Sequence, residues 1–506
     1  MLYLGIDLGT TFSLASFINA AGQVALIPDK FDTNSFRTPS LVHIGSNGCF
    51  VGDAVESQLL EDPSSDHVRF VKLAMGEDFN YQDHLQRQWR PETISALILK
   101  KLLTDTESFL PEDVSAAVIT VPANFSDAQR QATKQAGMLA GIKQIALIEE
   151  PIAAATFYGM NDISGDKTLF VYDLGGGTFD ATLLQSANDG LFVLATDGQH
   201  DLGGKTVDEA IMQQVADEYR RVHGNDPRED STSGNVALVQ LRQFATEAKL
   251  ELCKPGVSQV RKTLLLNNRT VDFLLTTTQF NRLVDKLVDQ SIKVAERCLS
   301  AASMDWEFID HILLTGGSSL LPLVRDKLAQ RTGRSREDLM LKQPHQAVAY
   351  GAALIADQFY ADGKNSKTLQ RATAWQLGIR VAGTDGQPCV HVIIDKNQPV
   401  PVNKTVNFPT NRENQPRMVI EVVQQKEDKQ EEKSLGYFIF SLPEGTAKNY
   451  QLEINLAYDM EGMVTATALD PKTGQQLKKI IDETGAALDD ELINQKEWVA
   501  NTRVNE

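Results

Sequence analysis

The sequence predicts a chain with two unlike parts, an α/β region that runs to about residue 360 and an all-β region beyond it. Up to residue 360, apolar segments of strand length alternate with segments of helical periodicity, which is the order typical of α/β proteins. Beyond residue 372, apolar and polar residues alternate in short segments, as they do in half-buried strands. The 506 residues suffice for about three units of ~150 residues each.

Composition excludes several classes of protein. The net charge of −18 disfavours nucleic acid as a partner, because an acidic surface repels polyanions. The four cysteines form no C-x-x-C pair, which disfavours a disulfide framework or a structural zinc site. The sequence shows no basic leader and no apolar run of the ~18 residues that a membrane span needs, so a cytoplasmic protein without a membrane partner is expected.

One pattern occurs twice in the α/β region: an apolar strand, an aspartate and a leucine, a glycine-rich turn, and a return strand. Residues 3–17 (YLGIDLGTTFSLASF) and 169–183 (LFVYDLGGGTFDATL) both follow it. The repetition predicts two hairpins of one design and two lobes built on one plan. Coincidence between two glycine-rich turns is the alternative, and the matching strands on both sides disfavour it.

Helices are expected between these strands. Ser126 and Gln129 have the spacing of a capping box, and the helix that they begin should stop at Gly141. Residues 116–121 are continuously apolar, as in a strand buried inside a parallel sheet. Residues 278–299 carry an apolar stripe at helical spacing, and a strand at 311–315 follows.

The all-β region follows a polar, turn-rich segment at 361–366, and we expect a linker over 361–372. A β-sandwich is predicted over 373–482, with a charged loop at 424–433. Residues 483–506 hold at most one short acidic helix. The predicted strands are 390–394, 402–408, 418–423, 437–440, 452–458 and 464–468.

The glycine-rich turns indicate a phosphate site, because backbone N–H groups can face a phosphate where no Cβ intervenes. Such turns lie at residues 9–11, 175–178, 203–204 and 316–318. Asp7, Asp173 and Asp180 stand at strand ends beside two of them, and Mg²⁺ prefers carboxylates together with substrate phosphates. Any one of these aspartates alone would more often be a turn or cap residue.

A P-loop is excluded because one required glycine is missing. Gly204-Lys205-Thr206 resembles the end of that motif, which requires glycine at residue 199, and Gln199 stands there.

Several motifs resemble the DnaK-type seventy-kilodalton heat-shock chaperones, in a short form of bacterial type. They are GIDLGTT (5–11), VITVPAN (118–124) with FSDAQRQAT (125–133), EP (150–151), VYDLGGGTFD (171–180), LGG (202–204), NQP (414–416) and KSLG (433–436). The resemblance covers nearly the whole chain. It implies a two-lobed, actin-like (RNase H-like) ATPase domain over 1–360, a linker, a peptide-binding β-sandwich, and no helical lid.

The resemblance also assigns roles to matching residues. Asp7, Asp173 and Asp180 would hold Mg²⁺, and K⁺ is a further candidate cation. Lys72 would position the attacking water, with Glu150 and Thr178 completing the surroundings of that water. Asp7 and Asp173 count among the catalytic residues as well. The ATP and ADP contacts would be Gly9, Thr10, Thr11, Gly175, Gly176, Gly177, Gly203, Gly204, Lys249, Gly316, Gly317 and Ser318. Apolar groove positions would be Ile379, Phe408, Met418 and Ile420, for which plain sandwich core is an equally good interpretation.

The sequence departs from the family pattern on the adenosine side and in the linker. Leu320 and Thr246 replace a basic residue and a glutamate, which predicts weaker ATP binding or relaxed base preference. His345 stands where an acidic residue is usual. The linker offers one leucine, Leu369, before Arg371, which puts the coupling of ATP binding to peptide release in doubt.

An ATP-hydrolysing chaperone for extended apolar peptides is therefore expected, working with a J-domain protein and an exchange factor. Two rivals stay open. A nucleotide-dependent regulatory protein without a functional peptide cycle fits the altered linker, and a sugar or acetate kinase shares the actin-like fold but lacks the β-region.

Overall fold

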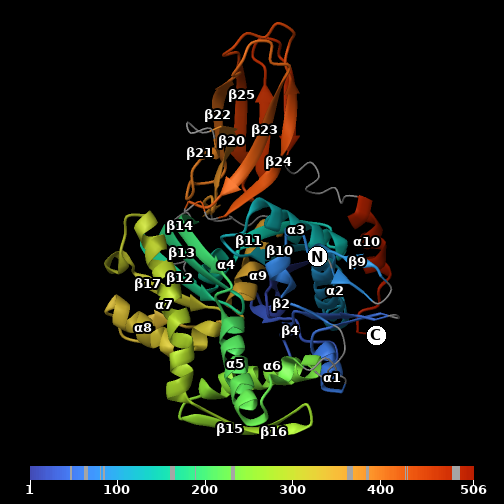
Figure 1. The fold of residues 1–506 in the computed structure, drawn as a ribbon, viewed down its shortest axis with the longest axis vertical. Helices are drawn as coiled ribbons and strands as arrows, with labels where there is room; N and C mark the ends of the chain where they lie inside the picture. Colours follow the sequence, from blue (N-terminus) through green and yellow to red (C-terminus); the bar gives the residue numbers. More distant parts are fainter. Residues whose placement is uncertain are drawn as a thin grey trace.

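A computed structural model gives the structure of the protein. It describes residues 1–505 apart from 46–47, 62–66, 80, 84–85, 160–165, 188–189, 230–233, 362–367, 383–386, 428, 430 and 481–489. Two α/β units lie together, and a β-sandwich stands on them (Figure 1).

The first α/β unit is built on a six-stranded sheet with the order β11-β10-β1-β2-β3, in which β4 also pairs with β2. Its hairpin, β1 with β2, is antiparallel, and β10 and β11 add in parallel, as the apolar residues 116–121 predict for β10. The strands are β1 (Leu2–Leu8), β2 (Phe12–Ile18), β3 (Val24–Leu26), β4 (Thr38–Pro39), β10 (Val114–Val121) and β11 (Ile145–Glu149).

Helices α2 (Pro91–Phe109) and α3 (Asp127–Leu139) pack together beside this sheet. The predicted capping box begins α3: the Ser126 side chain accepts from the Gln129 N–H, and the Gln129 side chain accepts from Ser126 N–H. Smaller elements complete the unit. They are β5 (Leu41–Ile44), β6 (Cys49–Val51), α1 (Asp53–Glu61), β7 (Val68–Arg69), a 3-10 turn at Val71–Ala74, β8 (Tyr81–Gln82) and β9 (Gln88–Trp89).

The second α/β unit repeats the plan with the order β18-β17-β12-β13-β14-β19. The antiparallel hairpin of β12 with β13 matches that of β1 with β2, and β17 again adds in parallel. The predicted second hairpin is therefore confirmed. The strands are β12 (Lys167–Leu174), β13 (Thr178–Ala187), β14 (Gly190–His200), β17 (His311–Thr315), β18 (Leu339–Met340) and β19 (Thr368–Gln370).

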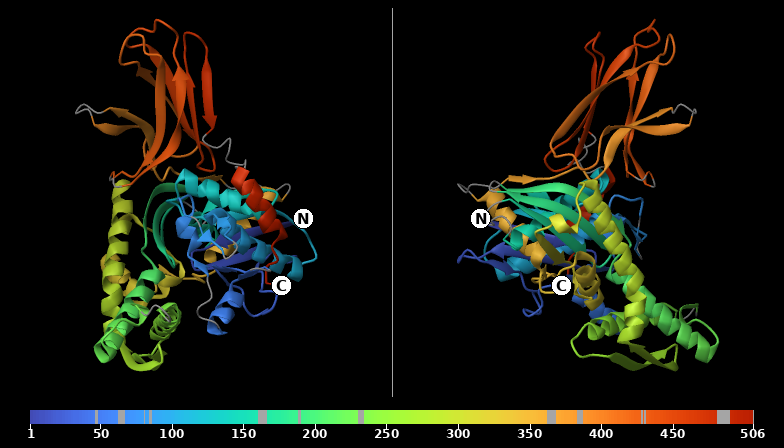
Figure 2. Two further views of the ribbon diagram at one scale, coloured as in Figure 1. Left: turned by 45° about the vertical axis from the view of Figure 1, so that its right-hand side comes forward. Right: turned by 90° about the vertical axis from the view of Figure 1, so that its left-hand side faces the viewer.

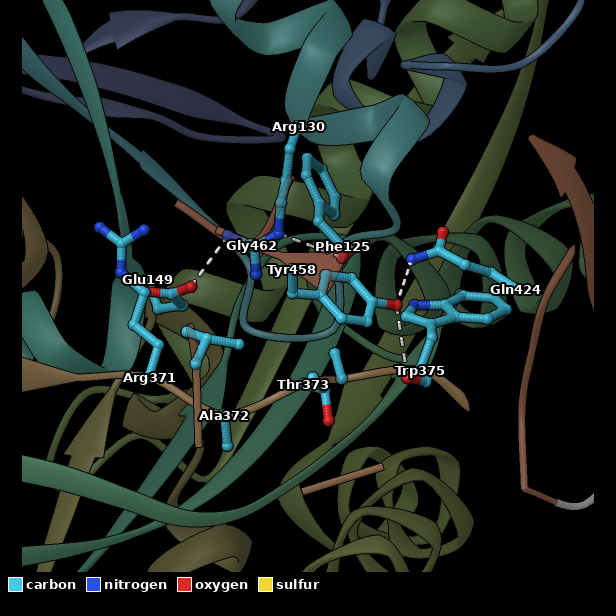
Figure 3. Close-up of a pocket in the computed structure, with 12 residues that line it drawn as sticks. Phe125, Arg130, Glu149, Arg371, Ala372, Thr373, Trp375, Gln424, Tyr458 and Gly462 are labelled. Carbon is cyan, nitrogen blue, oxygen red and sulfur yellow. Dashed lines mark hydrogen bonds and ion pairs between the residues drawn. The ribbon is translucent and has the colours of Figure 1, made fainter. Parts of the chain in front are cut away.

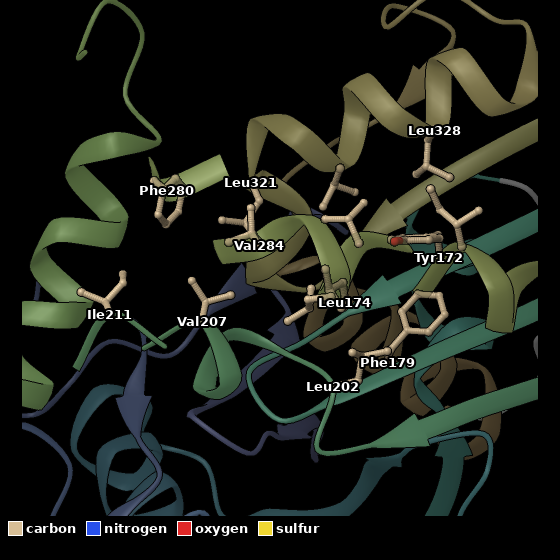
Figure 4. Packing of buried hydrophobic residues seen from close by; sticks show 14 of the residues in the cluster. Tyr172, Leu174, Phe179, Leu202, Val207, Ile211, Phe280, Val284, Leu321 and Leu328 are labelled. Atoms are coloured by element: carbon tan, nitrogen blue, oxygen red, sulfur yellow. The ribbon is translucent and has the colours of Figure 1, made fainter. Parts of the chain in front are cut away.

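Four helices and a hairpin share one buried apolar cluster with this second sheet (Figure 4). Within the cluster Tyr172 lies against Phe179, with ring centroids 4.5 Å apart. The elements are α5 (Gly204–His223), α6 (Gly234–Leu252), the hairpin β15 (Gln259–Leu266) with β16 (Arg269–Thr276), α7 (Thr277–Ala301) and α8 (Pro322–Thr332). Helix α6 and the hairpin reach the sheet through α5 and α7.

Helices α4 (Glu150–Phe157) and α9 (Ala347–Tyr360) pack on each other and share one apolar cluster with both sheets. Glycine permits the close approach. A Cβ on Gly5 would lie 2.0 Å from the backbone N of Ala353, and one on Gly351 would lie 1.7 Å from the backbone O of Ala153. These contacts hold the two helices tightly against each other and against β1, between the two sheets.

The β-sandwich consists of two four-stranded sheets, β21-β20-β23-β24 and β22-β25-β26-β27. All six predicted strands are present. Two more, β20 and β27, escaped prediction, and the expected loop at 424–433 shrinks to 426–431 between its flanking strands. The strands are β20 (Gln376–Ala382), β21 (Pro388–Ile394), β22 (Val402–Pro409), β23 (Arg417–Gln425), β24 (Glu432–Ser441), β25 (Gln451–Tyr458), β26 (Val464–Leu469) and β27 (Gln476–Ile480).

The segments on either side of the sandwich both return to the α/β units. Residues 368–370, expected as linker, form strand β19 at the edge of the second sheet, where β19 runs parallel to β14. The short C-terminal helix α10 (Asp490–Asn501) lies beside α2 of the first unit (Figure 2).

Candidate functional site

Four acidic side chains and one lysine lie together where the two α/β units meet, and all of them are buried except Asp7, which is half-buried. Asp7 lies in β1, while Asp173 in β12 is the register partner of Asp180 in β13. Glu150 is the first residue of α4, and Lys72 lies in the 3-10 turn. The electrostatic interactions of these five groups connect them into one cluster. The structure thus brings together all the residues predicted to bind metal or position water, with Thr178 adjoining them.

The lysine of this cluster is held by one carboxylate. Lys72 Nζ lies 2.5 Å from Glu150 Oε1, and 7% of the lysine is exposed. Its Nζ also lies 5.9 Å from the ring centroid of Phe125. Burial alone would lower the pKa of Lys72, but Glu150 and Asp7 outweigh burial and raise it. Lys72 therefore carries a fixed positive charge.

The positive charge of Lys72 does not compensate the three buried or half-buried aspartates, whose pKa values are raised. Burial and the neighbouring Glu150 raise the pKa of Asp7 to about 7 and that of Asp180 to about 8. The same two causes, with Asp180 and Asp7 added, raise the pKa of Asp173 well above its usual range. Like charges buried together hold protons unless a cation compensates them. A divalent cation at this place would let all three ionise.

Unpaired polar atoms mark the space beside Asp180. Oδ1 of Asp180 and both side-chain polar atoms of Asn124 are buried and have no hydrogen-bond partner among the described residues. Among all the residues that the structure describes, no three His, Cys, Asp or Glu side chains are placed so that they could hold a metal ion directly. This donor set fits Mg²⁺, which keeps several of its waters and binds proteins through few carboxylates.

The glycine turns of the two hairpins face each other. A Cβ on Gly176 would lie 1.9 Å from Thr11 Oγ1, and one on Gly177 would lie 2.8 Å from a methyl group of Thr10. Gly203 packs on the backbone of the second turn, because a Cβ added there would lie 2.8 Å from Gly175 O. Larger residues at these positions would hold the turns apart. Gly9 begins the first turn, and its added Cβ would meet Phe12 O at 2.1 Å.

Hydrogen bonds to Gly175 O join the turns at 203–204 and 316–318 to the second glycine-rich turn. The hydroxyl of Ser318 and the N–H of Gly204 both donate to Gly175 O, at 2.7 and 3.0 Å. Lys249 reaches Gly204 O at 3.3 Å and forms an ion pair with Asp208 at 2.8 Å. The predicted nucleotide contacts on the second unit therefore adjoin one another.

The departures from the family pattern also lie here. Leu320, at the end of the turn, is 39% exposed. His345 lies against Gly317, where an added Cβ would be 2.5 Å from the ring. Burial and Arg37 lower the pKa of His345, so the imidazole is neutral. Thr246 lies beside the Asp208 carboxylate of the Lys249 ion pair.

The four predicted groove residues divide into two pairs within the sandwich. Ile379 and Ile420 are buried in its apolar core, with 4% and 2% exposed. Phe408 and Met418 are partly buried and pack against the same core.

A buried ion-pair network joins the linker to the first unit, and sequence reasoning missed it. Arg130 of α3 and Arg371 after β19 both contact Glu149, at 2.8 and 3.0 Å (Figure 3). Burial would raise the pKa of Glu149, but Arg371 and Arg130 outweigh burial and lower it. Arg371 also donates to Met460 O of the sandwich at 2.8 Å. Glu149 is the residue before Glu150, so the network adjoins the lysine pair.

The sandwich docks on α3 around this network. Trp375 Nε1 donates to Asn124 O at 2.8 Å, and the Gln424 side chain accepts from Asp127 N–H at 3.1 Å. Asp127 in turn accepts from Val464 N–H at 2.8 Å. The sequence does not predict these contacts, because the two partners of each contact lie far apart in the chain and meet only when the sandwich docks.

Two further findings bear on identity. Among the described residues, no helix is both long and apolar enough to cross a membrane. A family model described as Hsp70 protein matches residues 3–504. The chain belongs to the Hsp70 family, whose members are ATP-dependent chaperones.

Proposed function

We propose that the two α/β units are the lobes of an actin-like ATPase and that the chain hydrolyses ATP to ADP and phosphate with Mg²⁺. One observation carries the proposal: Asp173, Asp180, Glu150 and Lys72 are buried together around the half-buried Asp7, beside two facing glycine turns. Phosphoryl transfer to water requires this arrangement, in which charge is neutralised and the nucleophile is aligned without covalent help from the protein.

Each group has a defined part in that reaction. When bound, Mg²⁺ neutralises charge on the phosphate oxygens. The backbone of Gly175, Gly176 and Gly177 and the hydroxyls of Thr10 and Thr11 contact phosphates. Lys72 orients the attacking water and places positive charge where negative charge develops. Glu150 holds the Lys72 ammonium in position at 2.5 Å.

We propose further that the β-sandwich binds extended apolar segments of unfolded proteins and that ATP turnover resets its affinity. The docked sandwich supports this proposal, because Arg371 contacts both Met460 O of the sandwich and Glu149, the residue before Glu150. A J-domain protein and an exchange factor are the expected partners, and the cytoplasm is the expected location.

Steady-state ATP hydrolysis tests the proposal, with and without an apolar heptapeptide and a J-domain protein. We expect slow basal turnover that both additions stimulate. Flat, slow hydrolysis would contradict the peptide cycle and leave a nucleotide-dependent regulatory protein. Phosphorylation of an added sugar or acetate would instead identify a kinase.

A further inference from the structure

A pocket opens beside the first glycine-rich turn, in the first α/β unit. It holds about 250 Å³ of space, with its solvent-open mouth included. Drug-sized ligands occupy pockets of roughly 300–1,000 Å³, so this one suits a smaller molecule or an ion. Thr10 and Thr11 of the turn line the pocket, together with Ser40, Glu56, Arg69 and Phe70.

Hydroxyl groups make one side of the pocket polar. Thr10 is 7% exposed and Ser40 is 4% exposed. The Ser40 hydroxyl donates to Gly9 O at 2.7 Å, and Ser40 N–H donates to Thr11 O at 2.8 Å. The residue that follows β4 is therefore fixed on the glycine-rich turn, and this side of the pocket is held in place by the backbone.

Arg69, the last residue of β7, brings a positive charge with an unused donor. Its Nε is buried and has no hydrogen-bond partner among the residues that the structure describes. Glu56 Oε1 lies 3.8 Å from Nη1 of Arg69, which is too far for a hydrogen bond. The Glu56 side chain is 48% exposed, so water screens this pair. A buried donor without an acceptor is costly, and an oxyanion in the pocket would supply the acceptor.

Helix α6 of the second unit packs against the first unit beside this pocket. Val239 of α6 contacts the apolar cluster of Leu41, Val55 and Leu59, and Leu41 lines the pocket. Figure 1 shows α6 beside α1 at this place. Arg242 follows Val239 by three residues, so both lie on the same face of the helix. The pocket therefore lies where the two units meet.

Two cations of the second unit approach the pocket. Burial lowers the pKa of Arg69, and repulsion from Arg242 lowers it further, so the two guanidinium groups are close to each other. Lys205 of α5 places its Nζ 5.4 Å from the ring centroid of Phe70, which lines the pocket. Because Arg69 and Arg242 come from different units and repel each other, an anion between them would be stabilised by both.

We propose that this pocket binds inorganic phosphate between Arg69 of the first unit and Arg242 of the second, as a site separate from the one that the nucleotide occupies. A guanidinium group matches a tetrahedral oxyanion through parallel N–H groups, and the buried Nε of Arg69 gains its acceptor. The hydroxyls of Thr10 and Thr11 supply further donors. The bound ion neutralises two like charges between the units. The inference goes beyond the proposed function, because phosphate binding here requires no hydrolysis.

Calorimetry with inorganic phosphate as the titrant tests this site. A non-hydrolysable ATP analogue with Mg²⁺ is kept saturating, so that the phosphate positions of the nucleotide site are filled. Potassium chloride keeps the ionic strength constant. We expect one phosphate per chain with a Kd of about 1 mM, the affinity of a few charge-assisted hydrogen bonds.

Substitutions with opposite effects separate phosphate binding from a structural role. Arg69→Gln and Arg242→Gln should each raise the Kd for phosphate about tenfold, and Arg69→Lys should recover part of the loss. Glu56→Gln should lower the Kd, because it removes the carboxylate that competes for Arg69. Residues that merely support the fold would not change the Kd in opposite directions. Arg221→Gln is the matched control and should leave the Kd unchanged, since Arg221 is an exposed arginine of α5 that pairs with Glu218.

Three results would overturn the site. A Kd that is unchanged in Arg69→Gln and Arg242→Gln means that phosphate binds elsewhere. A Kd that is unchanged in Glu56→Gln means that the charge of the pocket does not matter. Displacement of the ATP analogue by phosphate means that the pocket belongs to the nucleotide site. A protein that binds no ATP analogue contradicts the proposed function instead, and the phosphate titrations of the same variants still decide the site.

Discussion

A lysine surrounded by four carboxyl groups is the residue on which the proposed hydrolysis depends. Replacing Lys72 with alanine removes the positive charge beside the attacking water, so turnover should fall about 10²–10³-fold, the size of the loss of one preorganised stabilising group. Binding of ATP should change little, because the proposed phosphate contacts come from the glycine turns. Turnover is measured at saturating ATP and binding by calorimetry.

Lys286→Ala is the control for this substitution, since Lys286 is an exposed lysine of α7. It should leave both quantities unchanged. Retained turnover in Lys72→Ala would contradict the role given to Lys72.

His345 makes the stability of the fold depend on pH, and a substitution of this residue should remove that dependence. Burial lowers the pKa of His345 below its ordinary value of 6.5, so folding favours the neutral ring. Below about pH 6.5 the unfolded chain takes up a proton more readily than the folded one, and stability is lost. We expect the Tm of the wild type to fall, relative to that of His345→Gln, between pH 7.5 and pH 5.5. A gap that stays constant over this range would contradict a depressed pKa.

At the scale of elements, the close packing of the two glycine turns can be tested by adding a methyl group to one of them. A methyl group on Gly176 would lie 1.9 Å from Thr11 Oγ1, whereas the nearest atom to one on Gly175 would be 3.5 Å away. Gly176→Ala should therefore raise the Kd for ATP at least about tenfold, a loss of ~1.4 kcal/mol. Gly175→Ala should cost less. Equal losses in the two variants would show that closeness of the turns is irrelevant.

The second prediction at this scale concerns Arg371, which follows strand β19 and contacts Glu149. Arg371→Gln leaves Glu149 with Arg130 as its remaining cation, and breaking a buried pair costs about 3–5 kcal/mol when the charge is left alone. We expect the variant to lose most of the peptide stimulation of ATP hydrolysis, and Arg371→Lys to recover part of it. Full stimulation in Arg371→Gln would show that the ion pair does not couple the two domains.

The elements were predictable where a local pattern decides them. The paired hairpins, strand β10 and the capping box of α3 follow from strands, turns and spacing within short segments. Strand β20 was missed although Leu377, Ile379 and Val381 alternate along it as in a half-buried strand. Gly378 between them is kept small by His391 O, which would lie 2.2 Å from an added Cβ. Strand β19 was missed because three residues pair with a distant strand edge, which no local pattern reports.

The site was predictable in its residues and less so in its surroundings. Aspartates beside glycine turns carry a signal of their own, and the structure brings Asp7, Asp173 and Asp180 together. Arg130 and Glu149 carry none, because an arginine on a helix and a glutamate at a strand end are ordinary surface residues in a sequence. Both are buried in the folded chain, each with 4% exposed, where they pair with each other and Glu149 with Arg371.

At the scale of the whole molecule, the position of the sandwich depends on a small number of buried contacts. Trp375 is 2% exposed at the junction and donates to Asn124 O, while Lys426 and Lys433 lie 5.3 and 5.8 Å from its ring. Loss of a buried aromatic side chain costs about 3–5 kcal/mol, a large share of what a docking interface of this kind provides.

Trp375→Ala should therefore undock the sandwich, and small-angle scattering should report a larger radius of gyration. Since residues on both sides of the sandwich stay packed on the α/β units, the sandwich should swing away from α3 rather than separate. Val419→Ala, at a 56% exposed position of β23, is the control that leaves scattering unchanged. An unaltered radius in Trp375→Ala, with circular dichroism showing a folded sandwich, would mean that docking survives without this side chain.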